Sequence, residues 1–279
     1  MITYKRYPYK EEEIAQRIEQ YSKAEWKHFT EGEAYRFILG CIDLTTLEGS
    51  DNTQKINELC ATAINFKDEE RDIPSTAAVC VYPPFVAQAK KLLKGTDIHV
   101  ASVAGAFPAG QSPLEVKLAE VKYAVNAGAD EIDMVISRGK FLEGNYQEVF
   151  DEIVSIKKAC DSAHLKVILE TGELKTADNI YAASMMAMEA GADFIKTSTG
   201  KIAVNATPES FLIMLDAISD YFQATGKMVG MKPAGGISDA EISLLYVKIL
   251  ENILGKQWLN KQYFRIGASR LAKKIQEKL

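Results

Sequence analysis

The stretch Ala192-Asp-Phe-Ile-Lys-Thr-Ser-Thr-Gly-Lys201 decides the fold. Its β-branched and aromatic residues predict a short strand that ends at Lys196, and a polar turn containing Gly200 follows directly. The residues before it have a helical pattern that stops at Gly191. A helix, a glycine stop, a strand and a polar loop form one unit of an alternating β/α protein. Lys196 is therefore expected at the carboxyl end of its strand, where (β/α)8 barrels keep their chemistry.

The same alternation recurs along the chain from residue 37 onward. Strands are predicted at 37–43, 77–82, 98–104, 131–136, 165–170, 192–196, 228–232 and 263–267. Helices are predicted between them, at 53–66, 84–94, 112–126, 145–163, 176–190, 208–224 and 238–254. The pattern predicts an α/β protein, a single (β/α)8 TIM barrel over residues 37–279. A doubly wound sheet is the rival, but the Gly-x-Gly-x-x-Gly that it usually carries after the first strand is missing.

Residues 1–36 are predicted to form an N-terminal helical extension outside the barrel. Residues 10–36 are rich in Glu, Lys, Gln and Ala, and their apolar positions, such as Ile14 and Ile18, are loosely periodic. A helix packed on the outside or floor of the barrel is the simpler interpretation. A regulatory or oligomeric role stays open.

The composition argues against several kinds of partner. A net charge of −5 without a long basic cluster argues against nucleic acid and anionic membranes. With no apolar signal region and no long apolar run, a cytoplasmic protein with reduced thiols is expected. The four cysteines lack CxxC spacing and the three histidines are scattered, so neither a metal nor another cofactor is expected. A homodimer is left open.

A weak internal repeat relates two of the predicted strands. Asn126–Asp133 and Glu189–Lys196 share a helix stop, a Gly-Ala-Asp and the start of a strand. Asp133 and Lys196 each lie five residues after the glycine. The two strands are the fourth and sixth, and alternate strands of a barrel contribute side chains to the same layer. Asp133 and Lys196 are therefore expected to point inward at about the same height.

The neighbouring seventh strand also ends in a lysine, Lys232. A lysine attacks a carbonyl only when neutral, which near pH 7 requires its pKa to fall by roughly 3 units, about 4 kcal/mol. A second ammonium ~6 Å away at an effective dielectric constant of ~20 supplies about 2.8 kcal/mol, and desolvation supplies the rest. The pair therefore indicates amine chemistry, in which one lysine becomes neutral beside the positive charge of the other. The alternative is that either lysine is solvated or salt-bridged.

Carboxylates are expected inside the barrel beside these lysines. Strand alternation places Glu131 and Asp133 on the interior face, with Asp133 nearer the top as a proton-transfer group. Glu131 is predicted to pair with Lys166 in a structural role. Asp43, at the end of the first strand, is a further inward acid, and Thr45 follows it.

Three glycine-containing loops suggest a phosphate site, because glycines let backbone amides approach an oxyanion. They follow the sixth, seventh and eighth strands, and barrels commonly bind phosphate at the last two. The candidate residues are Thr199, Gly200, Lys201, Gly235, Gly236, Ser238, Gly267, Ser269 and Arg270.

At these residues the chain resembles the deoxyribose-phosphate aldolase family of class I aldolases. The matching segments are Asp43–Leu47, Val79–Pro83, Ala129–Val135, Lys166–Lys175, Asp193–Lys201 with Val204–Pro208, Lys232–Gly236 and Phe264–Ser269. The resemblance implies metal-free, reversible cleavage of 2-deoxy-D-ribose 5-phosphate to D-glyceraldehyde 3-phosphate and acetaldehyde.

The resemblance also implies roles for individual residues. Lys196 forms the imine, Lys232 lowers its pKa, and Asp133 transfers protons with a water and with help from Asp43. Lys201 and the glycine loops hold substrate hydroxyls or phosphate. Two other functions stay open, an imine-forming barrel aldolase with another phosphorylated substrate and a catalytically silent barrel that binds a sugar phosphate for regulation.

The chain departs from the family pattern at three places. Many relatives have a basic residue where this chain has Ser238, and many have serine where it has Arg270. The arginine is therefore expected to take over the phosphate contact. Well-studied bacterial relatives end in a tyrosine, whereas the sequence here ends Gln-Glu-Lys-Leu279.

Overall fold

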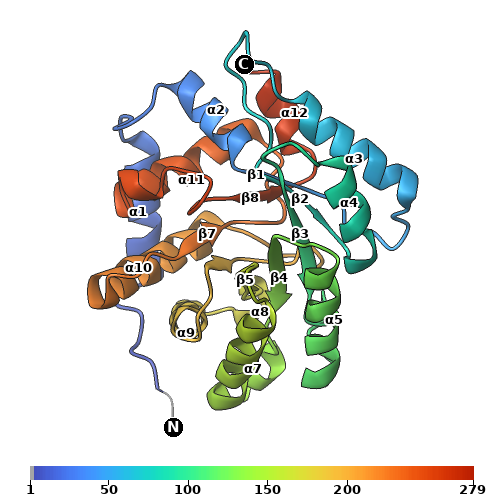
Figure 1. Cartoon of the computed structure of the whole chain (residues 1–279). Helices are drawn as coiled ribbons and strands as arrows, with labels where there is room; N and C mark the ends of the chain where they lie inside the picture. Colours follow the sequence, from blue (N-terminus) through green and yellow to red (C-terminus); the bar gives the residue numbers. More distant parts are fainter. Residues whose placement is uncertain (1–2) are drawn as a thin grey trace.

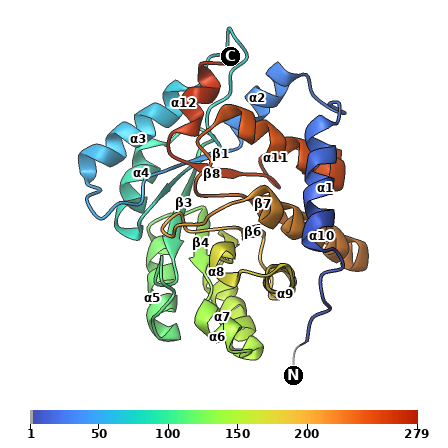
Figure 2. The same ribbon diagram turned by 180° about the vertical axis from the view of Figure 1, so that it is seen from behind.

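The computed structural model describes residues 3–279, in which eight parallel strands curl into a barrel surrounded by helices (Figures 1 and 2). The strands pair in the order β7-β6-β5-β4-β3-β2-β1-β8. Isolated parallel bridges from Met231 to Phe264 and from Ala234 to Gly267 join the two ends of this order. The ring of strands is thus closed, and the predicted (β/α)8 barrel is confirmed. Residues 1 and 2 of the predicted extension lie outside the described part.

The bounds of the elements follow the predicted alternation. The strands are β1 (Ile42–Thr45), β2 (Ala78–Val81), β3 (His99–Ala104), β4 (Glu131–Val135), β5 (His164–Ile168), β6 (Phe194–Lys196), β7 (Gly230–Lys232) and β8 (Ile266–Ala268). The predicted helices correspond to α3 (Thr53–Asn65), α4 (Val86–Leu92), α5 (Leu114–Asn126), α7 (Tyr146–Ala159), α9 (Ala177–Glu189), α10 (Pro208–Thr225) and α11 (Ala240–Ile253). Among the described residues, no helix is both long and apolar enough for a membrane crossing.

Several short elements have no counterpart in the prediction. They are the helices α6 (Arg138–Leu142), α8 (Thr171–Leu174) and α12 (Leu271–Gln276) and the 3₁₀ turn η2 (Lys256–Trp258). A further 3₁₀ turn, η1 (Pro83–Phe85), overlaps the start of the predicted helix 84–94. Each spans six residues or fewer, too few for an apolar face to repeat in the sequence.

The N-terminal segment is two helices, where the sequence predicted continuous helix. α1 (Glu11–Lys23) ends before residues 24–30, and α2 (Glu31–Gly40) continues through the predicted boundary at residue 37. The first part of the predicted strand 37–43 is therefore wrong, because those residues complete α2. A capping box starts α2: Glu33 N donates to Thr30 Oγ1 over 3.4 Å, and Thr30 N donates to Glu33 Oε2 over 2.7 Å.

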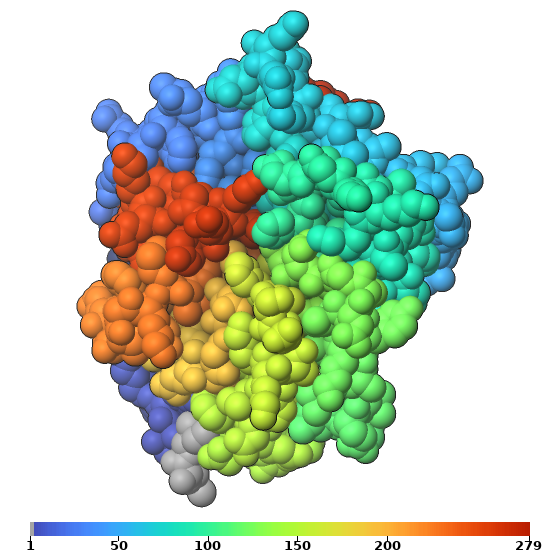
Figure 3. Space-filling view, in the orientation of Figure 1, coloured from blue at the N-terminus to red at the C-terminus, as the bar shows by residue number. Residues whose placement is uncertain are grey.

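The helix α1 packs on the outside of the barrel against α10 and α11. Both guanidinium NH groups of Arg17 donate to Asp216 of α10, over 2.6 and 2.7 Å. Tyr7, ahead of α1, donates its hydroxyl to the same carboxylate over 2.5 Å. Figure 3 accordingly shows part of the dark blue N-terminal segment beside the orange surface of α10.

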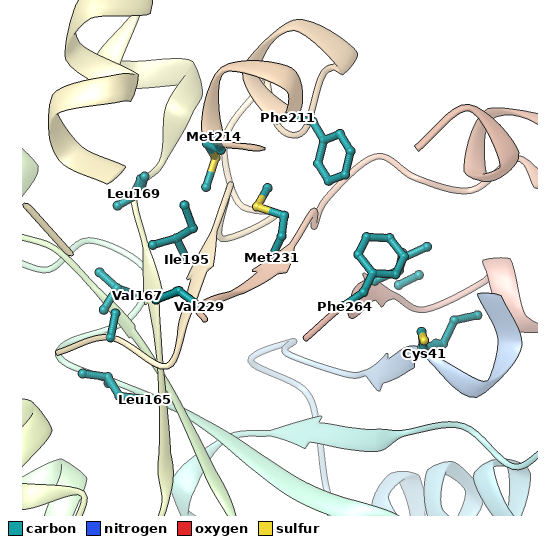
Figure 4. Close-up of a cluster of buried hydrophobic side chains, with 14 of the residues drawn as sticks. Cys41, Leu165, Val167, Leu169, Ile195, Phe211, Met214, Val229, Met231 and Phe264 are labelled. Carbon is teal, nitrogen blue, oxygen red and sulfur yellow. The ribbon is translucent and has the colours of Figure 1, made fainter. Parts of the chain in front are cut away.

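The outer face of the sheet explains which side chains reach the barrel interior. Leu165 and Val167 of β5 share a hydrophobic cluster with Met214 of α10 (Figure 4). Because side chains of a strand alternate between its two faces, the intervening Lys166 points the other way, into the barrel. Because the residues on both sides of Lys166 occupy the apolar outer face of β5, this charged residue lies inside the barrel.

Candidate active site

The barrel interior contains a cluster of charged side chains that are almost completely shielded from solvent. None of them is more than 3% exposed. The cluster comprises Asp43, Glu131, Asp133, Lys166, Lys196, Lys232 and Arg265. We refer to these residues as the interior charge cluster.

Lys196 and Lys232 meet at one carboxylate, that of Asp133. Their Nζ atoms each donate to Asp133 Oδ2 over 2.7 Å. The two lysines are paired in register between β6 and β7, so the predicted neighbouring amines are present. Asp133 and Lys196 thus both point into the barrel and meet there, as expected from strands of equal parity. Lys232 makes a second contact, over 2.5 Å, to Asp43 Oδ2.

The surroundings of the two lysines move their pKa values in opposite directions. Burial lowers the pKa of Lys196, and the charge of Lys232 lowers it further, against the opposing carboxylate of Asp133. Burial also disfavours the charge on Lys232, but the carboxylates of Asp133 and Asp43 outweigh it and raise the pKa. From the sequence, most of the lowering of the Lys196 pKa was assigned to the neighbouring ammonium. The structure corrects this, because full burial is the largest cause.

The lower part of the cluster holds the predicted pair of Lys166 and Glu131, which is confirmed as a hydrogen-bonded ion pair. Lys166 also donates to Asp133 Oδ1 over 3.1 Å. Arg265 was not predicted. It bridges two acids, donating to Asp43 Oδ1 over 2.7 Å and to Glu131 Oε1 over 2.8 Å. The alternation of Phe264 and Ile266, both in the apolar cluster, could have revealed it.

A cavity of about 680 Å³ opens above Lys196 at the carboxyl ends of the strands. The residues predicted to contact phosphate or substrate lie far apart in the chain, yet all of them line this cavity. They are Thr45, Thr199, Gly200, Lys201, Gly235, Gly236, Ser238, Gly267, Ser269 and Arg270. Asp43, Asp133 and Lys232 lie beneath it in the interior charge cluster.

The helix α3 supplies a wall of the cavity that the sequence analysis missed. Lys55, Glu58 and Thr62 line the cavity from this helix. Their spacing places them on one face of the helix. The sequence shows that this face is polar, but only the structure shows that it faces the cavity. Across the mouth, Lys201 is paired with Glu48 of the loop after β1 over 2.8 Å.

Glu170, at the end of the predicted fifth strand, holds the loop after β6. Its backbone has a left-handed φ of 57°, and its carboxylate accepts hydrogen bonds from Thr199 N over 3.1 Å and Thr199 Oγ1 over 2.5 Å. The backbone N–H of Lys201 in turn donates to Thr199 Oγ1 over 3.1 Å. Burial raises the pKa of Glu170. The contact was missed because nothing in a strand pattern marks its last residue as a loop anchor.

The fold and the site together define a (β/α)8-barrel enzyme with a buried lysine amine at the base of an open polar cavity. Within residues 3–279, no group of three or more His, Cys, Asp or Glu side chains is arranged to hold a metal ion.

Comparison with known proteins identifies the family. Residues 37–248 match the model of the DeoC/LacD family aldolases. Human deoxyribose-phosphate aldolase is 47% identical over 270 residues, which cover 92% of this chain and 83% of the human protein. The deoxyribose-phosphate aldolase of Bos taurus is 48% identical over 252 residues, or 86% of this chain and 78% of that protein. The chain belongs to the DeoC/LacD aldolase family.

Solved structures agree with this assignment. The deoxyribose phosphate aldolase of Aeropyrum pernix, described as a unique tetrameric structure, has a TM-score of 0.69 at 26% identity, covering 95% of this chain and 97% of that one. A triosephosphate isomerase of Bartonella henselae has a TM-score of 0.53 at 12% identity, covering 85% of this chain and all of its own, and supports the barrel fold alone.

Proposed function

We propose that the protein is a class I aldolase, a lyase that reversibly cleaves 2-deoxy-D-ribose 5-phosphate to D-glyceraldehyde 3-phosphate and acetaldehyde. The observation that carries this proposal is the amine of Lys196, which lines the cavity while its pKa is lowered by burial and by Lys232. A neutral amine at the base of a polar cavity suits attack on an aldehyde carbon. The names of the human and bovine relatives support the choice of substrate.

The reaction proceeds through covalent intermediates on Lys196. The neutral amine adds to the aldehyde carbon of the open-chain sugar, and the carbinolamine loses water to give a protonated imine. A base removes the proton of the C3 hydroxyl, the C2–C3 bond breaks, and its electron pair moves towards the imine to form an enamine. Glyceraldehyde 3-phosphate leaves, and protonation at C2 followed by hydrolysis releases acetaldehyde and the amine.

Asp133 is the proposed centre for proton transfer. Burial opposes its ionisation, but Lys166, Lys196 and Lys232 outweigh this and hold the pKa well below its usual range. The carboxylate is thus ionised. It accepts a proton directly, or through a water when the substrate lies too high in the cavity for direct contact. Asp43 assists by holding Lys232, the second cation on this carboxylate.

The phosphate is proposed to bind between the loops after β6, β7 and β8. Lys201 and Arg270 supply positive charge to the cavity, and Gly235, Gly236 and Gly267 allow a close approach of the backbone. Arg270 lines the same cavity as Ser238, which supports the proposal that it takes the place of a basic residue at 238.

Trapping of the imine tests the function directly. Acetaldehyde with borohydride is expected to leave an ethyl group on Lys196, identified by peptide mass spectrometry. A label elsewhere, or none, contradicts the proposal. Screening donor and acceptor aldehydes separates it from an aldolase with another phosphorylated substrate. A catalytically silent barrel would instead show thermal stabilisation by the sugar phosphate and no release of acetaldehyde.

The hydroxyl of Thr199 is expected to contribute to binding of the phosphorylated substrate. Replacing Thr199 with valine removes its hydrogen bonds with Glu170 and with the backbone of Lys201. A loss of about 1 kcal/mol of substrate-binding free energy corresponds to a roughly fivefold higher KM, with a smaller change in kcat. Ser198→Ala is the matched control, because Ser198 Oγ in the same loop has no hydrogen-bond partner among the described residues. Equal effects of both substitutions would contradict the role of Thr199.

We also propose a cytoplasmic location. All four cysteines are free and buried, which supports a compartment that keeps thiols reduced. The homodimer stays a prediction.

A further inference from the structure

The interior charge cluster contains more cations than anions. Its cationic side chains are Lys166, Lys196, Lys232 and Arg265, and its carboxylates are Asp43, Glu131 and Asp133. With every group ionised, four positive charges would face three negative ones. An unbalanced charge is costly where water is excluded, so loss of one proton from the cluster is favourable.

The contacts identify the group that gives up this proton. Lys166 lies within 4 Å of all three carboxylates, at 3.1 Å from Asp133, at 3.7 Å from Asp43 and in contact with Glu131. Lys232 contacts two carboxylates, whereas Lys196 contacts only that of Asp133 among the described residues. An arginine does not lose its proton in proteins. Lys196, the amine with the fewest carboxylate partners, is therefore the one that becomes neutral.

Arg265 is the member of the cluster whose charge cannot change. Its NH1 donates to Asp43 Oδ1 over 2.7 Å and its NH2 to Glu131 Oε1 over 2.8 Å. It thereby satisfies two acids that would otherwise draw a proton onto a neighbouring amine. We propose that Arg265 is a positioning residue that keeps the amine of Lys196 uncharged by balancing Asp43 and Glu131 with a fixed charge. The proposal rests on the proposed function, in which Lys196 is the nucleophile.

Two further titratable side chains, Cys80 and His99, lie next to the cluster. Cys80 of β2 is near Lys196, and burial raises the pKa of its thiol to about 11, so it is neutral at physiological pH. His99 of β3 contacts Glu131 from the rim of the cluster over 2.8 Å, and its side chain is 45% exposed. His99→Asn serves as a control for any contribution of this ring to a pH profile.

The test measures the pH dependence of borohydride-trapped acetaldehyde at Lys196. Arg265→Gln leaves the carboxylates in excess, which favours a protonated Lys196. The midpoint of labelling is expected to rise by about one pH unit. At a fixed pH below the midpoint, the neutral fraction of Lys196 is then about tenfold smaller than in the wild type. Arg265→Lys keeps a cation there, and its profile is expected near that of the wild type. Arg17→Gln is a matched control, since it removes an arginine paired with Asp216 outside the barrel.

The double variant Arg265→Gln/Glu131→Gln removes one charge of each sign and is expected to bring the midpoint back towards the wild-type value. A purely structural role for Arg265 predicts no such return, and the balanced double variant keeps the test available if Arg265→Gln does not fold. An Arg265→Gln profile equal to that of the wild type, or a double variant that stays shifted, overturns the role of Arg265 alone. Absence of a wild-type label overturns the proposed function and this proposal with it.

Discussion

Lys196→Met is expected to lower the rate of aldol cleavage by a factor of at least roughly 10³, since removing a covalent nucleophile has effects of this size or larger. A thioether cannot form the imine, and the neighbouring amine of Lys232 is held by Asp43 and Asp133. Steady-state release of acetaldehyde from the deoxysugar phosphate measures the effect.

Stability should not account for this loss. Lys196 is almost completely buried, and methionine replaces a buried polar group with an apolar one of similar length. Asp133 keeps its contacts with Lys166 and Lys232. The midpoint of thermal unfolding is therefore expected to stay the same or rise. Lys157→Met, which removes the partner of Asp193 outside the barrel, is the control and should keep its activity. Residual activity of Lys196→Met within tenfold of the wild type would contradict the role of this lysine.

Lys232→Leu is expected to have two large effects. Its ammonium lowers the pKa of Lys196, so its removal raises that pKa and moves the active limb of the pH profile to higher pH. For a cation at ~6 Å and an effective dielectric constant of ~20, the shift is about two pH units. The loss also leaves Asp43 and Asp133 without a partner they share, which costs about 3–5 kcal/mol of unfolding free energy.

Two measurements separate these effects. The pH dependence of borohydride trapping reports the pKa of Lys196, and urea unfolding reports the stability. Lys232→Arg keeps the positive charge beside Lys196 and is expected to preserve the pH profile better than leucine does. A Lys232→Leu profile that coincides with that of the wild type would remove the assigned role of Lys232.

Much of the barrel and of its inward residues could be predicted because strands alternate strictly. The period of two places Glu131 and Asp133 on one face, and the apolar residues between them belong outside. The error in the first part of the predicted strand 37–43 has the opposite origin. An apolar run of this length suits a strand or a buried helix, and the capping box at Thr30 shows that the chain is still helical there.

Other parts of the site could not be predicted because they depend on pairs that no local pattern links. Glu170 and Thr199 are 29 residues apart and meet only where the loops after β5 and β6 adjoin. The wall formed by Lys55 and Glu58 depends on the rotation of α3 about its axis relative to the barrel. Periodicity specifies that a helix has a face, whereas packing specifies what that face meets.

By itself, the sequence determined the alternating fold and the two lysines at the ends of neighbouring strands, since both follow from the local order of residues. Only the tertiary structure decided which of these lysines has its pKa lowered. That choice depends on how many carboxylates each amine touches and on a bridge from Arg265 to Asp43, 222 residues apart. Electrostatic energy depends on distance through space and on burial, and neither is written in the spacing along the chain.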